Sequence, residues 1–197
     1  MVRKLVVATG NPGKLVEMQE YLIDLPWELE LKPGSIDIEE TGTTFIANAR
    51  LKASRVAKAL GKWSIADDSG LAVDDLDGAP GLYSARYGKT DKDRIHRLLR
   101  ELGNTSNRQA KFICAVAIAN PEGKIVLETE GICTGEILKS PRGDSGFGYD
   151  PIFYVPSQQQ TFAEMSSEVK GKISHRGVAF AQVMPELIRL SEKLPTE

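Results

Sequence analysis

Apolar and polar positions alternate along the chain in blocks that predict short strands and helices in turn. Continuous apolar runs predict buried strands at Leu5–Ala8 and Trp63–Ala66. Apolar residues at helical spacing predict helices over Pro12–Ile23 and Thr44–Leu60, and Gly61 ends the second of them. Strands that alternate with helices in this way indicate an α/β fold.

The second half of the chain has a different pattern, with two long strands next to each other. Phe112–Ala119 and Ile125–Ile137 predict a hairpin-like antiparallel pair. Thr161–Glu168 is expected to form a short helix, and Gly177–Leu194 a closing helix that Pro185 bends or splits. These elements predict a mixed sheet flanked by helices.

The composition is that of an ordinary globular protein and disfavours several classes. The 197 residues suffice for one domain, which we expect to span residues 1–197. A formal net charge of -2 gives no global basic field, so we expect no nucleic-acid partner. No run is long enough to cross a membrane, and the start lacks the features of a signal peptide. Cys114 and Cys133 are expected to be buried thiols, which suits a cytoplasmic protein.

Two adjacent carboxylates follow one of the predicted buried strands. Asp67 and Asp68 come directly after Ala66, and Ser69-Gly70 is interpreted as a turn that leads the backbone away. Side-by-side carboxylates repel each other, so a fold that keeps them together usually provides a cation. Metal binding or acid–base chemistry is one interpretation of the segment, and a solvated turn is the other.

A glycine-bearing turn lies between the first predicted strand and the first predicted helix. Its sequence is Thr9-Gly10-Asn11-Pro12-Gly13-Lys14. Such a turn presents backbone N–H groups at a helix N-terminus, which suits a phosphate, and its lysine adds a positive charge. The nucleotide-binding P-loop would have glycine where this chain has Ala8 and a hydroxyl where it has Leu15. A different phosphate turn and a plain strand–helix connection remain the two interpretations.

Acidic residues also precede the second predicted helix, at Glu39 and Glu40. Magnesium takes a few carboxylate oxygens and completes its octahedron with water and substrate phosphates. One acid from before the helix, together with Asp67 and Asp68 at the strand end, would supply those oxygens. The alternative for the two glutamates is ordinary acidic charge near a helix N-terminus.

Two further segments carry candidate ligand-binding side chains. Gly146–Pro151 combines glycines that permit close backbone approach with Phe147 and Tyr149, whose rings either stack on a base or complete the core. Lys170–Arg176 gathers three cations and His175 just before a predicted helix. These groups can donate hydrogen bonds to a base or to phosphates, and the alternative is a solvated basic turn.

Taken together, these segments resemble the inosine triphosphate pyrophosphatase family, the non-canonical purine nucleoside-triphosphate pyrophosphatases. The resemblance covers nearly the whole chain and keeps the family's order of motifs. Its most distinctive segments are Ala66–Gly70, Gly78–Gly81, Ser84–Tyr87, Gly146–Pro151 and Ser174–Arg176.

The resemblance implies an α/β fold with a long curved mixed β-sheet flanked by helices, two lobes with a central cleft, and a homodimer. It also implies an enzyme that hydrolyses inosine, deoxyinosine and xanthosine triphosphates to the monophosphate and pyrophosphate with magnesium (Mg2+), which cleanses the nucleotide pool. Residues 1–197 would then form a single pyrophosphatase domain.

Roles for individual residues follow from the same resemblance. The residue matching Asp68 is the proton acceptor and a metal-site residue, and Glu40 matches another metal-site acid. In the mechanism that we expect, Asp67 joins these metal-binding acids. Lys14 neutralises the triphosphate, with Lys52 and Lys170 as further candidates for this role. The positions that match substrate-binding residues are Thr9, Gly10, Asn11, Pro12, Gly13, Lys14, Ser69, Phe147, Gly148, Tyr149, Asp150, Lys170, His175 and Arg176.

One position departs from the family pattern. The family usually reads Thr-Phe-x-Glu-Asn-Ala where this chain has Ala47 in place of the glutamate. If that carboxylate touches the metal or orients water, magnesium affinity or turnover is lower in this chain. This departure leaves a catalytically silent nucleotide-binding module open as an alternative. The P-loop-like turn leaves a second one open, a phosphotransferase that would form a nucleoside diphosphate.

Overall fold

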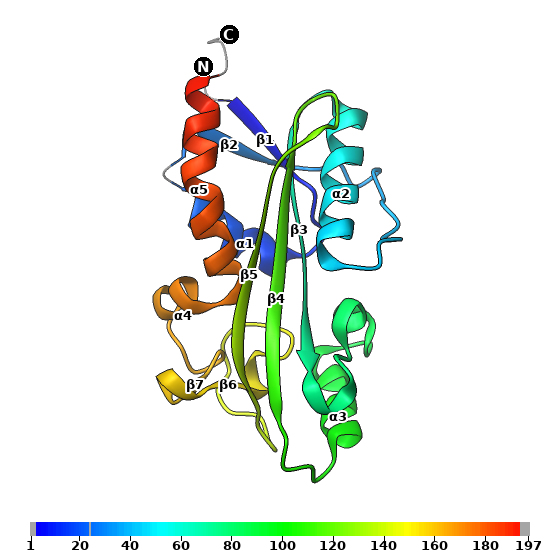
Figure 1. Ribbon diagram of the computed structural model, residues 1–197, viewed down its shortest axis with the longest axis vertical. Coiled ribbons are helices and arrows are strands. Elements are labelled where there is room, and N and C mark those ends of the chain that lie inside the picture. The colour runs from blue at the N-terminus through cyan, green and yellow to red at the C-terminus, as the bar shows by residue number, and fades with distance from the viewer. Residues whose placement is uncertain (1–2, 24, 194–197) are drawn as a thin grey trace. The chain divides into compact units, whose positions relative to one another are not determined.

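The computed structural model describes residues 3–23 and 25–193. Within these residues seven strands form one sheet in the order β2-β1-β3-β4-β5-β6-β7. Helices alternate with strands in the first half of the chain, and five α-helices are present in the described part. The predicted α/β fold with a mixed sheet flanked by helices is confirmed (Figure 1).

The first three strands form the parallel part of the sheet. β1 (Arg3–Val7) pairs in parallel with β2 (Trp27–Leu31) on one side and with β3 (Trp63–Val73) on the other. In the pairing of β1 with β3, Val7 lies opposite Ile65. This register brings the turn that follows β1 beside the middle of β3.

The remaining strands complete the sheet, in part through antiparallel pairs. β4 (Gln109–Ala119) is followed by β5 (Ile125–Ile137), and the two are neighbours in the sheet. β6 (Phe153–Val155) pairs in antiparallel fashion with β5 and with β7 (Gln160–Thr161). The two long strands thus match the predicted neighbouring strands closely.

The helices begin and end at residues with recognisable capping functions. Thr44 caps α2 by accepting a hydrogen bond from the backbone N–H of Ala47, and Gly61 ends that helix in the left-handed conformation, as predicted. Pro185 lies inside the last helix, which continues through it as one element. The α-helices are α1 (Pro12–Leu22), α2 (Phe45–Leu60), α3 (Asp91–Leu102), α4 (Ser167–Ile173) and α5 (His175–Lys193).

The chain divides into two compact units, and each is built from non-contiguous segments. Unit 1 comprises Met1–Asp68, Cys114–Gly131 and Arg176–Glu197, and unit 2 comprises Ser69–Ile113 and Ile132–His175. The strands β3, β4 and β5 each contribute residues to both units. The expectation of one domain over residues 1–197, with a cleft between two lobes, stays a prediction.

Unit 1 has helices on both faces of its strands. Leu5 and Val7 of β1 face a core that α1 and α5 cover, whereas Val6 between them faces α2. Figure 1 shows α1 and α5 on one side of these strands and α2 on the other. The α2 face is lined by small residues such as Ala49 and Ala53, which let the helix approach the sheet closely.

Unit 2 has its own apolar core, which contains a group of packed aromatic rings. Phe112, Phe153 and Phe162 form mutual ring contacts with centroids 4.7 to 5.7 Å apart. Leu98 of α3 and Leu71 of β3 are fully buried in the same cluster. These contacts give unit 2 a hydrophobic centre of its own.

Two sequence predictions about local structure are wrong. β3 does not end at Ala66, because it continues through the Asp67-Asp68-Ser69-Gly70 segment as far as Val73. The acids stay within the strand because cations neutralise each of them, as described below. The helix expected over Thr161–Glu168 is also absent, since Gln160–Thr161 is a strand and α4 starts only at Ser167.

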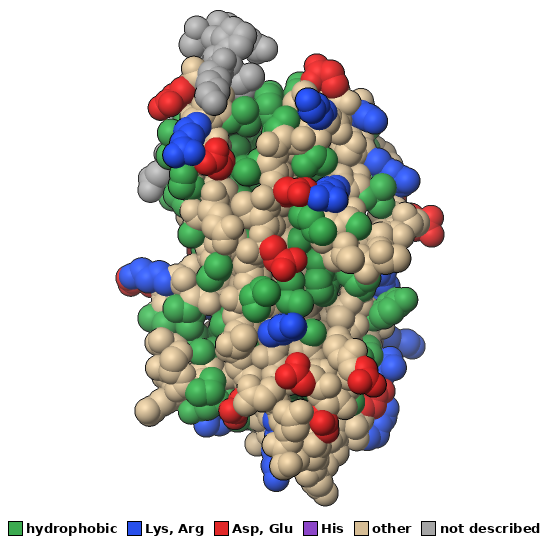
Figure 2. Space-filling view, viewed as in Figure 1, with side chains coloured by type: hydrophobic (Ala, Val, Ile, Leu, Met, Phe, Trp, Pro, Cys, Tyr) green, Lys and Arg blue, Asp and Glu red, His purple; other side chains and the backbone are tan. Residues whose placement is uncertain are grey.

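The face of the molecule drawn in Figure 2 shows no region dominated by one sign of charge. In Figure 2 acidic and basic side chains are interspersed on the face shown. This distribution agrees with the formal net charge of -2. No helix in the described part of the chain is long and apolar enough to cross a bilayer.

Candidate functional site

β3 directs the two adjacent acids to opposite faces of the sheet. Successive residues of a strand point to opposite sides. Ile65 therefore belongs to the core under α1 and α5, and Ala66 belongs to the core under α2. The same alternation directs Asp67 toward α1 and α5 and Asp68 toward α2, as their contacts show. The two carboxylates thus contact separate groups of partners.

Asp68 contacts two polar side chains of α2. Its Oδ2 accepts a hydrogen bond from Asn48 Nδ2 at 3.0 Å, and Lys52 Nζ lies 3.4 Å from its Oδ1. Asn48 and Lys52 are four residues apart, so they lie on one face of the helix. The Lys52 ammonium also lies 2.7 Å from Glu40 Oε1. Glu40 and Asp68 therefore share a partly buried cation although they are far apart in sequence.

The loop that carries Glu40 is held against the start of α2 through Gly42. The Gly42 N–H donates to Asn48 Oδ1 at 2.7 Å. A Cβ atom on Gly42 would lie only 2.5 Å from this oxygen, so glycine permits the approach. Asn48 is 2% exposed. The two ends of its side-chain amide link Asp68 to the loop that carries Glu40.

Asp67 belongs to a closed ring of four charges on the other face. Lys14 Nζ lies 3.0 Å from Asp67 Oδ2, and Arg176 Nη2 lies 3.4 Å from the same oxygen. Arg176 Nη1 also forms an ion pair with Glu17, which lies three residues after Lys14 on α1. The ring therefore runs from α1 through β3 to the start of α5 and back to α1. The Asp67 side chain is 0% exposed, so its charge depends on these cations.

The surroundings shift the pKa values of the two acids in opposite directions. Burial alone would raise the pKa of Asp67, but the charges of Lys14, Arg176 and Lys52 outweigh it and hold this pKa below its usual value. Burial raises the pKa of Asp68 above its usual value, because the charges of Lys52 and Lys14 offset it only in part. Of the two, Asp68 is the carboxylate that accepts a proton more readily.

The turn between β1 and α1 is a capped strand–helix connection. Asn11 Oδ1 accepts hydrogen bonds from the N–H groups of Gly13 and Lys14 at 2.9 and 3.4 Å. Thr9 Oγ1 accepts a hydrogen bond from the Asn11 N–H at 3.2 Å. A Cβ on Gly10 would meet no described atom within 4 Å, so this residue lies on the open side of the turn. Phosphate binding by the turn stays a prediction.

In unit 2, the loop Gly146–Asp150 is closed by its own last side chain. Asp150 Oδ2 accepts a hydrogen bond from the Phe147 N–H at 3.0 Å and lies 2.8 Å from Lys170 Nζ. Lys170 Nζ also lies 5.2 Å from the centre of the Phe147 ring, which is a cation–π distance. The structure therefore brings together three predicted substrate-binding residues of this unit.

His175 and Ser69 are two further predicted residues of unit 2. The His175 ring stacks on Phe112 with centroids 4.6 Å apart at 12°, and Phe162 lies 6.3 Å away at 15°. The histidine is therefore part of the aromatic core as well as a candidate ligand contact. Ser69 is half-buried in β3 directly after Asp68. Its role as a substrate contact stays a prediction.

Few acidic side chains of the site are placed to bind a metal ion. Within the described residues no group of three or more His, Cys, Asp and Glu side chains is placed to hold a metal ion. Glu40 and Asp68 nevertheless converge on one ammonium group. Magnesium characteristically takes only one or two carboxylates and completes its octahedron with water and phosphate oxygens, so these two acids fit it. For Asp67, the role of metal ligand stays a prediction.

Two residues of the site were not identified from the sequence. Asn48 and Glu17 hold Asp68 and Arg176, respectively. A signal was present in the spacing, because Asn48 precedes Lys52 by four residues and Glu17 follows Lys14 by three. Side chains at these separations share one face of a helix.

Fold and site together define an α/β protein in which one strand carries two buried acids that are neutralised by cations from the flanking helices. The sequence profile described as the Ham1 family matches residues 5–186. The chain belongs to the Ham1 family, and this confirms the family resemblance seen in the sequence.

Similar proteins and structures cover nearly the whole chain. A dITP/XTP pyrophosphatase of Nostoc sp. is 64% identical over 187 residues, which are 95% of this chain and 95% of that protein. A HAM1 protein from Coxiella burnetii has a structure that matches 95% of this chain and 99% of its own, with a TM-score of 0.87 and 45% identity. The structure of a dITP/XTP pyrophosphatase from Mycobacterium abscessus matches 93% of this chain and 99% of its own at 39% identity, with a TM-score of 0.73.

Proposed function

We propose that this chain hydrolyses non-canonical purine nucleoside triphosphates, namely ITP, dITP and XTP, to the nucleoside monophosphate and pyrophosphate. The observation that carries the proposal is the convergence of Glu40 and Asp68 on the Lys52 ammonium. Such a cluster combines acids that can bind a metal and accept a proton with a cation that can bind a phosphate. The names of relatives that are 64% identical support the same reaction. In a cell this activity would remove these nucleotides from the pool.

Mg2+ is the metal that we assign to the site, with Glu40 and Asp68 as its protein ligands. When bound, a magnesium ion neutralises phosphate charge and makes a coordinated water more acidic. Asn48 would hold the Asp68 carboxylate in place, because its amide nitrogen already donates to one of the two carboxylate oxygens. Gly42 and Asn48 together would fix the loop that presents Glu40.

Asp68 acts as the general base in this proposal. Burial raises the pKa of its carboxyl group, which favours acceptance of a proton from the attacking water. The water would attack the α-phosphorus in line with the departing pyrophosphate. Most of the rate enhancement in such a reaction comes from positioning and charge neutralisation rather than from covalent chemistry.

The cations of unit 1 bind the triphosphate. Lys14 lies at the start of α1, and Asp67 holds its ammonium from one side at 3.0 Å. Lysine carries three N–H donors, so this contact leaves donors for phosphate oxygens. Lys52 supplies a second ammonium beside Asp68. The turn from Thr9 to Gly13 adds the positive end of a helix dipole.

Recognition of the purine is assigned to predicted residues of unit 2 and to Arg176. A donor aimed at the 6-keto oxygen would accept inosine and xanthosine, whereas adenine places an amino group there. An unpaired or opposed buried donor costs about 1–3 kcal/mol. The residues that we assign to this role are Ser69, Phe147, Gly148, Tyr149, Asp150, Lys170, His175 and Arg176.

A homodimer in the cytoplasm completes the proposal. The homodimer rests on the family resemblance, and static light scattering measures it directly. The compartment is supported by Cys114 and Cys133, which are buried free thiols. Such thiols suit a reducing environment.

The test replaces Asp68 by asparagine and measures pyrophosphate release. Asp68→Asn keeps the shape of the side chain but removes the base, so kcat should fall by about 10²–10⁴-fold. The assay uses ITP, dITP, XTP, ATP and GTP with and without magnesium. Asp74→Asn, which changes an exposed aspartate of the chain, is the matched control and should retain wild-type turnover.

Product analysis separates the proposal from its alternatives. Formation of a nucleoside diphosphate would instead indicate a phosphotransferase. Binding of ITP without hydrolysis at saturating magnesium would indicate a silent nucleotide-binding module. Near-normal turnover of the Asp68→Asn variant would contradict the role of this residue.

A further inference from the structure

The loop Gly146–Asp150 needs partners outside itself to keep its shape. Gly146 and Gly148 both have positive φ angles, of +77° and +64°, which side-chain-bearing residues rarely adopt. A Cβ on Gly146 would lie 2.1 Å from Asp150 Oδ2, so the loop folds tightly over its own carboxylate. Asp150 and Lys170 hold one end of the loop through their ion pair.

The centre of the loop is held by α3. Asp91 is the first residue of this helix, and its Oδ2 accepts a hydrogen bond from the Gly148 N–H at 2.7 Å. Its second oxygen, Oδ1, accepts a hydrogen bond from Arg94 Nη1 at 2.6 Å. Arg94 also donates to the Gly88 carbonyl at 3.3 Å. The carboxylate is therefore oriented by one partner and bonded to the loop by its other oxygen.

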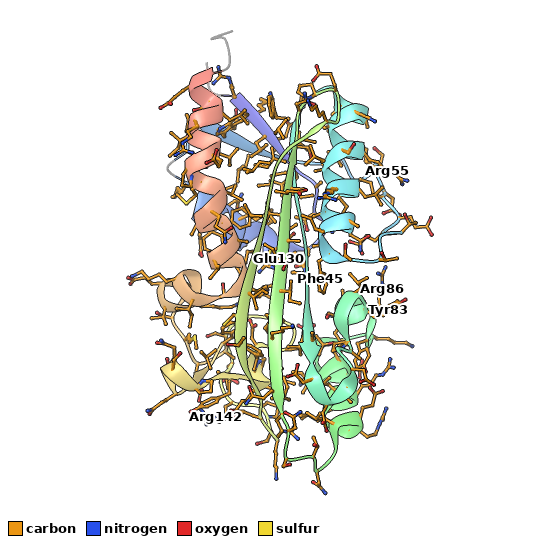
Figure 3. All side chains as sticks on the ribbon, viewed as in Figure 1. Phe45, Arg55, Tyr83, Arg86, Glu130 and Arg142 are labelled. Carbon is orange, nitrogen blue, oxygen red and sulfur yellow. The ribbon has the colours of Figure 1, made fainter. Side chains whose placement is uncertain are left out.

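Neighbouring contacts support the same part of the loop. The Tyr149 hydroxyl donates to the carbonyl of Ser84 at 2.9 Å, and this serine lies between Tyr83 and Arg86, which are labelled in Figure 3. The segment before the loop is held by Arg142, also labelled there, whose Nη2 lies 2.8 Å from Glu164 Oε2. Asp91 remains the contact that fixes the backbone of the loop at its centre.

The capping of α3 does not require Asp91. Thr90 and Asp93 form a complete capping box, in which each side chain accepts a hydrogen bond from the backbone N–H of the other residue. The charge of Asp91 interacts favourably with the dipole of α3. Its two carboxylate oxygens, however, accept hydrogen bonds from Arg94 and from the Gly148 N–H. Its specific contribution is therefore to the loop.

We propose that Asp91 is a positioning residue that sets the backbone of the loop Gly146–Asp150 for purine binding. This inference rests on the proposed function, which assigns contacts with the purine to that loop. Asp91 acts through the Gly148 N–H and does not itself touch the substrate. Loss of its carboxylate releases the central amide and lets the loop leave the conformation that binds the base.

The experiment compares Asp91→Ala with Asp93→Ala. Both variants remove an acid from the first turn of α3, but only the first removes the bond to Gly148. For Asp91→Ala we expect KM for ITP to rise about 10-fold with kcat within about 2-fold of wild type, since uniform binding is lost. Asp93→Ala should lower the melting temperature at least as much because it breaks the capping box, and should leave KM unchanged.

Rescue and amide exchange test the contact itself. Asp91→Asn retains a side-chain oxygen for the Gly148 N–H, so its KM should lie closer to that of wild type than to that of Asp91→Ala. Hydrogen exchange of the Gly148 amide should accelerate in Asp91→Ala and not in Asp93→Ala. An equal rise of KM in Asp91→Ala and Asp93→Ala would show a general effect of α3 stability and overturn the inference.

Phe147→Ala separates failure of this inference from failure of the proposed function. If Phe147→Ala raises KM, and Asp91→Ala accelerates exchange at Gly148 but leaves KM unchanged, the positioning role is overturned while the purine-binding loop stands. If Phe147→Ala and Asp91→Ala both leave KM unchanged, the assignment of the loop is wrong and the inference is overturned with it.

Discussion

Asp67 and Asp68 show how the same residue type acquires different properties at neighbouring positions. One carboxylate lies between two cations and has a lowered pKa, although its burial acts in the opposite direction. The other has a raised pKa, because burial outweighs the charge of Lys52. The alternation of the strand gives the two side chains separate contacts, although the charges of Lys14 and Lys52 act on both acids.

At the scale of single residues, the buried cysteines predict a pH dependence of stability. Burial raises the pKa of Cys114 to about 12 and that of Cys133 to about 11. In the unfolded chain a thiol has a pKa of about 8.5. Above that pH the unfolded chain releases protons that the folded chain retains. Each thiol should therefore lower the free energy of unfolding by about 1.4 kcal/mol per pH unit above about pH 8.5.

Urea unfolding between about pH 7.5 and about pH 10 under reducing conditions tests whether the free energy of unfolding falls as the pH rises. Cys133→Ala should show a shallower decline than wild type by about 1.4 kcal/mol per pH unit, and the double variant with Cys114→Ala a still shallower one. Comparison with the variants removes the contribution of lysines and tyrosines, which titrate in all of them. Identical slopes for wild type and the double variant would contradict the expected burial of the thiols.

Much of the site could be predicted at this scale, but not its geometry. The sequence identifies Glu40, Asp68, Lys14 and Lys52 as candidates, and the structure brings Glu40, Lys52 and Asp68 together. The sequence does not indicate that Asp67 and Asp68 face opposite sides of the sheet, because a Ser-Gly pair after two acids is equally typical of a turn. The cations that neutralise the two acids within the strand come from the flanking helices, which are distant parts of the chain.

At the scale of elements, the start of α2 explains what a glutamate would do in place of Ala47. Thr44 is the N-cap, and its side chain accepts a hydrogen bond from the Ala47 N–H at 3.2 Å. The residue at this third helical position completes a capping box when it is glutamate or glutamine. Ala47 cannot return that hydrogen bond, so α2 has half of the motif.

Ala47→Glu should therefore stabilise the protein by about 0.5–1 kcal/mol through the cap and the helix dipole. For a chain of this size each kcal/mol raises the melting temperature by about 2–4 °C. Ala47→Gln is the control, since it can make the hydrogen bond without the charge. Calorimetric titration of magnesium into both variants shows whether the carboxylate also affects the metal. A higher magnesium affinity without a gain in melting temperature would contradict the capping role.

Helices could be predicted more reliably than strand ends. The expected helices over Pro12–Ile23 and Thr44–Leu60 match α1 and α2 to within one residue at each end. Their apolar periodicity and their caps are local signals. The helix expected over Thr161–Glu168 fails because Thr161 pairs with Tyr154 of β6, which is a contact that local pattern cannot reveal.

At the scale of the whole molecule, the two units share strands but not cores. Leu98 of α3 is fully buried in the core of unit 2, and Leu187 of α5 is fully buried in a core of unit 1. β3, β4 and β5 each continue from one unit into the other. Neither unit retains all its strands when the other unfolds, so we expect one cooperative unfolding transition.

Leu98→Ala and Leu187→Ala test this expectation from the two sides. Each should destabilise the protein by about 2–5 kcal/mol through the cavity it leaves. Both should shift a single calorimetric peak whose van't Hoff enthalpy equals the calorimetric one. Two separate peaks, with each variant moving only one of them, would show that the units unfold independently.

The alternation of side chains along β3 also limits which insertions and deletions the strand can tolerate. The uninterrupted alternation along the strand decides which side of the sheet each residue faces. This applies to Ile65, Ala66, Asp67, Asp68 and Leu71. A single residue inserted or deleted within the strand before Asp67 would exchange the two faces and leave each acid beside the wrong helix. Substitutions in this part of the strand can therefore be accepted one at a time, whereas a change of its length would disrupt both groups of contacts at once.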